Sequence, residues 1–332
     1  MTAAPYAATL LRYAGCCCGA ALAAYGTYRL GRGAGLKDRQ ATGLALVSPF
    51  LLGLVLFTAW PVLFSLYLSF TEYRVLGVPR WVGLRNYAAI FFRGADRQTF
   101  LTALFVSGTY ALFSVPLGIT ASLATAMLLN TRVRLLGLWR TVYYMPSVLP
   151  AVATALVWRW LFVKGGLVNS ALAALGLPEP GWFDDPRWVL PAFVIMSLQG
   201  ATGNNMVIFL AALKGVPREL YEAALIDGAG FWARLRHVTL PQISPVILFQ
   251  LVMGIIGALQ VFTQPMFIKT PGNSGLFYNV YIYRRAWGEL RMGYACALAW
   301  ILFVVILALS ALVLAHSRRW VHYGYRPGEE WR

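Results

Sequence analysis

Long apolar segments alternate with short charged segments along most of the chain. Six of them are long enough to cross a membrane, since a hydrocarbon core of about 30 Å needs about 20 residues of helix. All 12 acidic residues fall outside these segments, as the high cost of a charge at the bilayer centre requires. The six segments cover roughly residues 43–70, 99–130, 141–163, 188–213, 242–268 and 292–315. The pattern therefore predicts an all-α polytopic membrane protein with a six-helix core.

A weaker apolar segment precedes the six. Residues 5–28 are rich in Ala and Gly but contain Arg12. A transmembrane helix, a helix lying at the membrane interface and a cleaved signal peptide are the alternatives. A signal peptide is disfavoured because the basic cluster follows the apolar stretch instead of leading it. We therefore expect an extra N-terminal transmembrane helix within an extension over residues 1–42, a transmembrane domain over residues 43–315 and a cytoplasmic tail over residues 316–332.

Composition and charge narrow the class further. Hydrophobic residues make up 59% of the chain and charged residues only 12%, against about 25% charged residues in soluble domains. The net charge of +16 raises the question of nucleic acid, but the basic residues are scattered over many short loops, so anionic lipid headgroups explain them more simply. Three of the four Cys are adjacent, Cys16 to Cys18, which fits neither a disulfide framework nor a metal site.

The distribution of basic residues between loops predicts the orientation. The loops at residues 29–42, 131–140, 214–241 and 316–332 together carry 15 Lys and Arg, and those at 71–98, 159–187 and 269–291 carry 12. Positive residues are enriched on the cytoplasmic side of membrane proteins. The first set, which is shorter and more basic, is therefore expected to be cytoplasmic.

The loop at residues 214–241 has helical features of its own. Pro217 suits a helix start, and Glu219 and Glu222 lie near the positive end of that helix. The pair Asp227-Gly228 indicates a turn, after which a second helix can begin near Phe231. The loop therefore predicts a short helix–turn–helix between two spans, and an ordinary amphipathic connector is the alternative.

Four blocks at fixed spacing in this loop resemble the EAA signature of importer-type ABC transporter permeases. The first block is Glu222-Ala223-Ala224, and Gly228 follows after three residues. After nine further residues come Val238 and Leu240-Pro241, where the family pattern has Ile in place of Val238. Over residues 43–315 the chain looks like the maltose/glycerol-3-phosphate-type sugar permeases. Further support comes from Gly83-Leu84-Arg85-Asn86-Tyr87, Met145-Pro146 and the stretch from Gly293 to Leu298.

Two departures from the family pattern leave the substrate open. Gln199 stands where such permeases usually carry Trp. The sequence Thr270-Pro271-Gly272-Asn273-Ser274 replaces a T-G-G-P-like loop. Both departures lie near the expected transport path or its outer mouth.

The resemblance implies a permease subunit of an ATP-driven ABC importer for a sugar or related polyol in a bacterial plasma (inner) membrane. The implied partners are a second permease subunit of a different chain, two ATPase subunits, an extracytoplasmic solute-binding protein and membrane lipid, with no nucleic acid. The loop would form the coupling helix that docks on an ATPase. The expected coupling residues are Glu222, Ala223, Ala224, Asp227 and Gly228.

The chain itself is not expected to be an enzyme. None of its four Lys follows a Gly, so a nucleotide-binding P-loop is excluded, and ATP–Mg is expected on the partner ATPase with no cofactor in this chain. The only His are His237, His316 and His322, all in loops or at the end of a span. We therefore expect neither catalytic residues nor a metal site.

Neutral amides within the spans are the candidates for the substrate path, because they can hydrogen-bond hydroxyl-rich ligands. Gln260 and Gln264 are i, i+4 neighbours and would share one face of a helix. Hydrogen bonding between helices is the alternative role for every such amide. The candidates are Gln199, Asn204, Asn205, Gln260 and Gln264.

Other functions stay open to different degrees. An ABC permease for glycerol phosphate, peptides, amino acids or another small solute fits the same motifs. An ion-coupled secondary transporter or channel is disfavoured because the spans contain no ionisable coupling residue. A membrane-embedded enzyme lacks a catalytic constellation. A non-transporting assembly or sensory subunit could keep the docking loop.

Overall fold

The computed structural model describes residues 4–131 and 134–322, with side chains from Gly19 onward. The side chains of Cys16 to Cys18 and the tail beyond residue 322 lie outside the described part. The chain divides into two compact units, with the boundary between Ser69 and Phe70.

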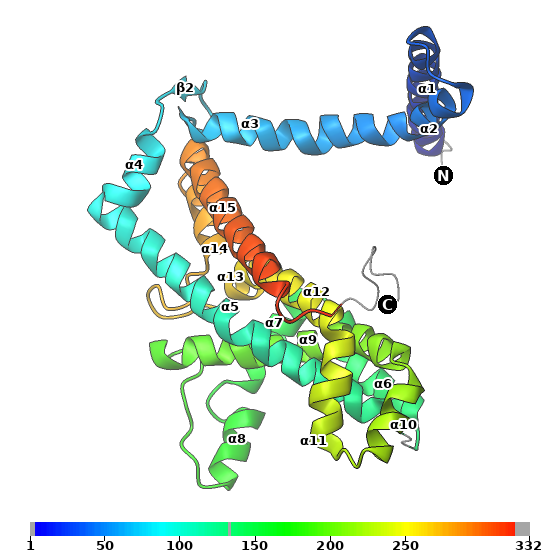
Figure 1. Ribbon diagram of the computed structural model, residues 1–332. Helices are drawn as coiled ribbons and strands as arrows, with labels where there is room; N and C mark the ends of the chain where they lie inside the picture. The colour runs from blue at the N-terminus through cyan, green and yellow to red at the C-terminus, as the bar shows by residue number, and fades with distance from the viewer. Residues whose placement is uncertain (1–3, 132–133, 323–332) are drawn as a thin grey trace. The chain divides into compact units, whose positions relative to one another are not determined.

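The first unit consists of helices. It contains α1 (Ala4–Gly33), α2 (Asp38–Leu54), a π-turn η1 (Val55–Ala59) and α3 (Trp60–Ser69). Residues Asp38–Ser69 form one candidate membrane span, and α1 packs against α2, as Figure 1 shows. α1 confirms a helix over residues 5–28, but it is not among the described helices that are both long and apolar enough to span. The extra transmembrane helix therefore stays a prediction.

The second unit carries the rest of the described chain (Figure 1). It starts with a small hairpin, and its long helices α5, α9, α12 and α15 are candidate spans. Its elements are β1 (Thr71–Glu72), β2 (Arg80–Trp81), α4 (Arg85–Phe92), α5 (Gly94–Leu129), α6 (Leu136–Tyr144), a 3₁₀ turn η2 (Met145–Val148), α7 (Ala151–Leu161), α8 (Leu167–Ala174), α9 (Pro186–Gly215), α10 (Arg218–Ile226), α11 (Phe231–Arg234), a π-turn η3 (Leu235–Thr239), α12 (Leu240–Leu259), α13 (Thr263–Phe267), α14 (Tyr278–Tyr283), a π-turn η4 (Arg284–Gly288) and α15 (Met292–Ser317).

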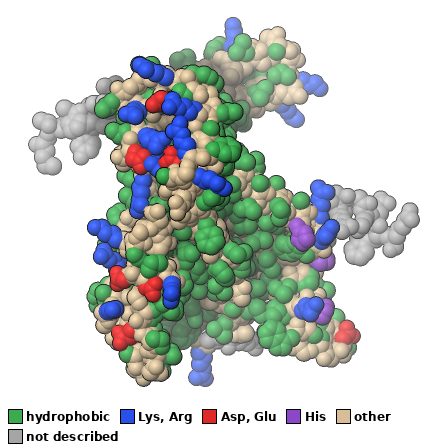
Figure 2. Space-filling model, turned by 90° about the vertical axis from the view of Figure 1, so that its left-hand side faces the viewer, with side chains coloured by type: hydrophobic (Ala, Val, Ile, Leu, Met, Phe, Trp, Pro, Cys, Tyr) green, Lys and Arg blue, Asp and Glu red, His purple; other side chains and the backbone are tan. Residues whose placement is uncertain are grey.

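Five helical segments of the described chain are long and apolar enough to cross a membrane, and a bent pair of helices makes up to six. This confirms the predicted all-α membrane class. The surface in Figure 2 is accordingly rich in hydrophobic side chains, with charged ones gathered in separate places.

The prediction of one continuous span over residues 141–163 is wrong. The segment consists of Leu136–Val148 and Ala151–Leu161, which are bent by 101° relative to each other. Leu149 has an extended backbone, ψ 138°, because the Pro150 ring disfavours a helical conformation at the preceding residue. The turn η2 packs tightly on α9: a Cβ placed on Gly203 would lie 2.7 Å from the Cβ of Ser147. A glycine is therefore required at this contact.

Two of the π-turns end two residues before a proline. η1 ends at Ala59 before Pro61, and η3 ends at Thr239 before Pro241. Proline cannot donate the i→i−4 hydrogen bond, and its ring clashes with the carbonyl four residues earlier. We infer that the wider π-turn accommodates the proline and lets each helix continue into its span.

Small residues bring α5 and α9 into close contact. A Cβ on Gly118 of α5 would lie 3.1 Å from the Cβ of Ala201 on α9, and the Ser122 hydroxyl donates to the Ala201 carbonyl over 3.0 Å. Close backbone approach through small residues is typical of helix packing in membranes. This pair, with α12 beside it, forms the centre of the second unit.

Arg285 joins the start of α5 to the residues before α15. Its guanidinium donates to Asp96 at 2.9 Å and to both Glu289 oxygens at 2.6 and 2.7 Å, and it lies over the ring of Tyr281. Burial lowers the pKa of Arg285, but hydrogen bonds to Glu289 and Tyr281 raise it by more, so the pKa ends above its usual value. The side chain therefore stays charged.

We expect Arg285→Met to lower the stability of the protein by about 2 kcal/mol, because it leaves the partly buried Asp96 carboxylate without its donor and removes two hydrogen bonds to Glu289. The measurement is thermal unfolding in mild detergent. Arg284→Met is the matched control, because Arg284 is exposed and forms no ion pair in the described part of the chain. Equal melting temperatures for the two variants would contradict a stabilising role of this cluster.

Candidate functional site

The predicted helix–turn–helix is present. α10 begins directly after Pro217 and ends in a Schellman motif, in which the Ala229 N–H donates to the Ala224 carbonyl and the Gly228 N–H to the Leu225 carbonyl. Gly228 has φ +73°, a left-handed conformation that glycine adopts without steric cost. This explains the glycine of the EAA pattern as the residue that reverses the chain after α10.

The predicted coupling residues lie together on the surface of this loop. Glu222, Ala223, Asp227 and Gly228 are exposed, and Ala224 is half-buried. Within the described residues, Glu222 forms no ion pair. An exposed carboxylate beside a small Ala surface leaves room for a partner to approach closely. Their contact with an ATPase stays a prediction.

Large apolar side chains surround these residues, and the sequence analysis did not single them out. Ile226 is 87% exposed and Trp232 is 76% exposed, and Leu225 and Phe231 are also exposed. Figure 1 shows α10 and α11 projecting from the start of α12. Exposed apolar groups next to charged ones are typical of a protein-binding surface. The signal in the sequence was two pairs of large apolar residues, Leu225-Ile226 and Phe231-Trp232, on either side of the Asp227-Gly228 turn.

Tyr221 attaches α10 to the membrane helix that follows. Its hydroxyl lies 3.0 Å from the Thr239 hydroxyl, which in turn donates to the Arg234 carbonyl at 3.4 Å. The Tyr221 ring packs on a buried cluster that includes Leu213 and Ile243. The outer helix of the loop is therefore fixed to both α9 and α12.

A double-mutant cycle of Tyr221→Phe and Thr239→Val should give a coupling energy of about 1 kcal/mol, the usual contribution of one hydrogen bond. The measurement is the free energy of unfolding of the purified protein for the wild type, both single variants and the double variant. Strictly additive effects would show that the two hydroxyls do not stabilise the loop together.

A cavity of about 170 Å³ lies between α5, α9 and α12. Its wall combines polar groups, including Asn205, Gln250 and Ser114, with the glycines Gly254 and Gly257. Gln250 is only 4% exposed, and its amide nitrogen has no hydrogen-bond partner among the described residues. A buried unpaired donor costs about 1–3 kcal/mol, so the cavity favours a ligand or water that can accept a hydrogen bond.

The structure separates the predicted path residues. Asn205 lines the cavity, whereas Asn204 is exposed on another face of α9. The side-chain carbonyl of Gln199 accepts a hydrogen bond from the indole N–H of Trp158 on α7, so it joins two helices. Gln250, which was not among the predicted path residues, is the amide that shares the cavity with Asn205.

The predicted helical pairing of Gln260 and Gln264 is wrong. α12 ends at Leu259, Gln260 is its C-cap, and Gln264 belongs to the separate helix α13. Pro265 provides the reason: as part of a continuing helix its ring would clash with the carbonyl four residues earlier. Gln260 is exposed, and its backbone carbonyl accepts a hydrogen bond from the Asn279 side chain at 2.8 Å.

Comparison with known proteins agrees with this architecture. Residues 114–322 match the family of binding-protein-dependent transport system inner membrane components. The chain is 36% identical over 294 residues to the Probable ABC transporter permease protein YesP of Bacillus subtilis (strain 168), covering 86% of this chain and 93% of that protein. It is 30% identical to the arabinooligosaccharides transport system permease protein AraP of the same organism, covering 84% of this chain and 90% of that protein.

A solved structure shows the same fold. It is a bacterial alginate ABC transporter in complex with alginate pentasaccharide-bound periplasmic protein, 26% identical, with a TM-score of 0.71 over 85% of this chain and 96% of that chain. The family match covers the second half of α5, all of α9 and α12, the helix–turn–helix loop and α15. The chain therefore belongs to the family of binding-protein-dependent transport system inner membrane components, the permease subunits of ABC transporters.

Proposed function

We propose that this protein is one of two permease subunits of a saccharide importer in a bacterial inner membrane. The exposed helix–turn–helix loop carries the proposal, because a transport subunit without its own P-loop needs a surface that transmits ATP-driven movement from another polypeptide. Relatives whose names specify a cargo include a permease for arabinooligosaccharides, and a related solved transporter imports alginate. These names support a saccharide or related polyol as the cargo.

The proposed partners are two ATPase subunits and an extracytoplasmic solute-binding protein. Two ATPase subunits would bind ATP–Mg, and one of them would receive α10 in a groove on its surface, with Glu222 facing a cationic or hydroxyl group. An extracytoplasmic solute-binding protein would deliver the cargo, as the family description and the periplasmic protein in the related complex support.

A second permease subunit explains the exposed amides. Asn204 in α9 and Gln260 at the end of α12 are exposed in the single chain. An amide facing lipid without a partner is costly, so such groups usually face another protein chain or a water-filled path. We expect the second permease to cover this surface, with the cavity beside Asn205 opening toward the shared path.

Affinity purification of the full chain from its native membrane in mild detergent tests the proposal. The expected result is co-purification of an ATPase, a second permease and a solute-binding protein, and ATP-dependent saccharide uptake when the assembly is placed in vesicles. Recovery of the chain alone at near-native levels would contradict it. Assembly without uptake would instead support the alternative of a non-transporting sensory subunit.

A further inference from the structure

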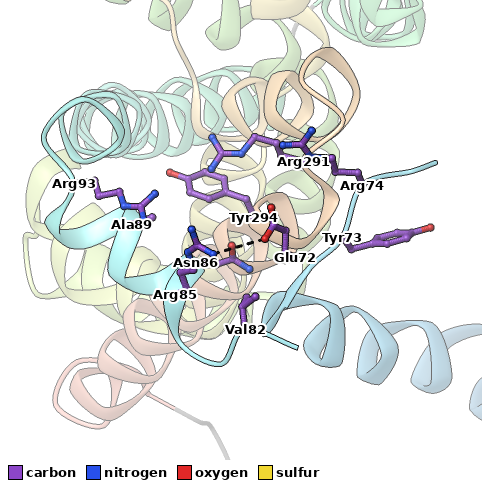
Figure 3. A pocket seen from close by; sticks show the side chains of 10 residues that line it. All are labelled: Glu72, Tyr73, Arg74, Val82, Arg85, Asn86, Ala89, Arg93, Arg291 and Tyr294. Atoms are coloured by element: carbon purple, nitrogen blue, oxygen red, sulfur yellow. Dashed lines mark ion pairs between the residues drawn. The ribbon is translucent and has the colours of Figure 1, made fainter. Parts of the chain in front are cut away.

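An arginine-rich pocket of about 310 Å³ lies in the second unit, away from both the loop and the cavity. Four of the ten residues that line it are Arg and one is Glu. Figure 3 shows the pocket, in which Arg85 and Arg93 come from the two ends of α4 and Arg291 precedes α15. The side chains used below are Glu72, Arg74, Arg85, Arg93, Arg291 and Tyr294.

The backbone itself places two of the arginines side by side. Arg74 and Arg291 form an isolated antiparallel bridge, and the Gly293 N–H donates to the Tyr73 carbonyl at 3.2 Å. The backbone therefore holds two arginines from distant parts of the sequence opposite each other, and both line the pocket. Like charges repel each other, so the folded chain maintains this arrangement against an electrostatic cost.

The described acidic residues compensate this charge only in part. Glu72 lies 3.8 Å from Arg85, with both side chains more than half exposed, and Glu289 lies 3.7 Å from Arg291 while it also accepts from Arg285. Arg74 and Arg93 have no ion-pair partner in the described part of the chain. The pocket therefore keeps a positive charge that an external anion can neutralise.

The pocket is also partly preorganised. The Arg291 guanidinium lies 4.4 Å from the centre of the Tyr294 ring, which limits its freedom. α15 begins at Met292 beside it, so the positive end of a long helix adds to the field. Planar guanidinium groups form paired hydrogen bonds with carboxylate, sulfate and phosphate groups.

The chain topology assigns the pocket to the extracytoplasmic side. The coupling loop precedes α12, and the pocket lies at the beginning of α15, after α12 has crossed the membrane once. Basic residues are usually enriched on the cytoplasmic side, so orientation does not explain this cluster. It faces the compartment from which the cargo arrives.

We propose that this pocket binds the oxyanion group of an extracytoplasmic ligand, held between Arg74 and Arg291 with Arg85 and Arg93 at its rim. A carboxylate on an acidic saccharide is one source of that group, and this source rests on the proposed function. The phosphate of an anionic lipid headgroup is the other source. Neutral sugars lack the group and are not bound there.

Binding to the purified full chain in phosphatidylcholine nanodiscs tests the saccharide source. The probe is digalacturonate, with the neutral disaccharide lactose for comparison, and calorimetry measures the affinity. We expect digalacturonate binding to be weakened at least tenfold by Arg74→Gln and by Arg74→Gln combined with Arg291→Gln. Arg80→Gln is the matched control, because Arg80 is exposed in the same hairpin and does not line the pocket.

A second arm tests the lipid source. The thermal stabilisation that phosphatidylglycerol gives over phosphatidylcholine should be reduced in Arg74→Gln and kept in Arg80→Gln if a headgroup occupies the pocket. A selective loss in either arm supports the oxyanion site and identifies its source. The absence of any difference between Arg74→Gln and Arg80→Gln in both arms would overturn it. Neither arm requires an ATPase, so this outcome is independent of the co-purification experiment.

Discussion

Glu222→Lys is expected to reduce ATP-driven uptake by tenfold or more in vesicles that contain the complete transporter. Glu222 is exposed in the middle of α10 and forms no ion pair within the described residues, so its carboxylate is free to meet a partner. Reversing a charge at a protein interface introduces a repulsion of several kcal/mol, and about 1.4 kcal/mol already corresponds to a tenfold change in affinity. The measurements are uptake and the amount of ATPase that co-purifies.

Glu219→Lys provides the control for Glu222→Lys. Glu219 is exposed in the first turn of the same helix and lies outside the EAA block. Both substitutions change the net charge equally. Glu219 lies closer to the positive end of the helix, so Glu219→Lys should destabilise α10 at least as much as Glu222→Lys does. If the two variants lost uptake to the same extent, the loss would be caused by the change in net charge and not by the position of Glu222.

Gly257→Leu is expected to reduce transport by tenfold or more while the assembly with the ATPase stays intact. Gly257 lines the cavity between α5, α9 and α12, and nothing lies within 4 Å of a Cβ built on it. The new side chain can therefore enter the cavity without displacing the backbone, and it would occupy the space that a passing ligand needs. Removing a helical glycine also lowers the entropy lost on folding, so no loss of stability is expected.

Gly108→Leu is the matched control for this substitution. Gly108 lies within α5, has open space around its Cβ position and does not line the cavity. The uptake rate and the melting temperature should be measured for both variants. Normal uptake by Gly257→Leu would show that the cavity does not belong to the transport path.

The amino-acid sequence was sufficient to predict the spans that consist of regular helix. Apolar length and the exclusion of acids define Gly94–Leu129 and Met292–Ser317 with errors of a few residues. The bend at Pro150 and the end of α12 at Leu259 were missed, because hydropathy is the same on both sides of a break. A proline alone does not mark a break, because Pro116 and Pro245 lie inside α5 and α12. Whether the helix ends at a proline, and where the chain goes afterwards, depends on packing.

The functional surfaces were predictable to different degrees. The helix–turn–helix loop was predicted because its residues are close in sequence and keep fixed spacing. The other two sites combine residues that are distant in sequence. Asn205 and Gln250 line the same cavity from different helices, and Arg74 and Arg291 meet through a backbone bridge at the pocket. No local pattern predicts such contacts, and they require the packing of the long helices.

The uninterrupted connection from α11 through η3 to α12 has a mechanical consequence. Residues Phe231–Leu259 form one helical rod of roughly 40 Å, at 1.5 Å per residue. If the coupling loop tilts this rod by about 10°, the opposite end moves sideways by roughly 7 Å, since displacement grows with distance from the pivot. Gly254 and Gly257 lie near that opposite end. A small displacement of the loop at one end of this segment would thus be amplified at the cavity wall near the other end.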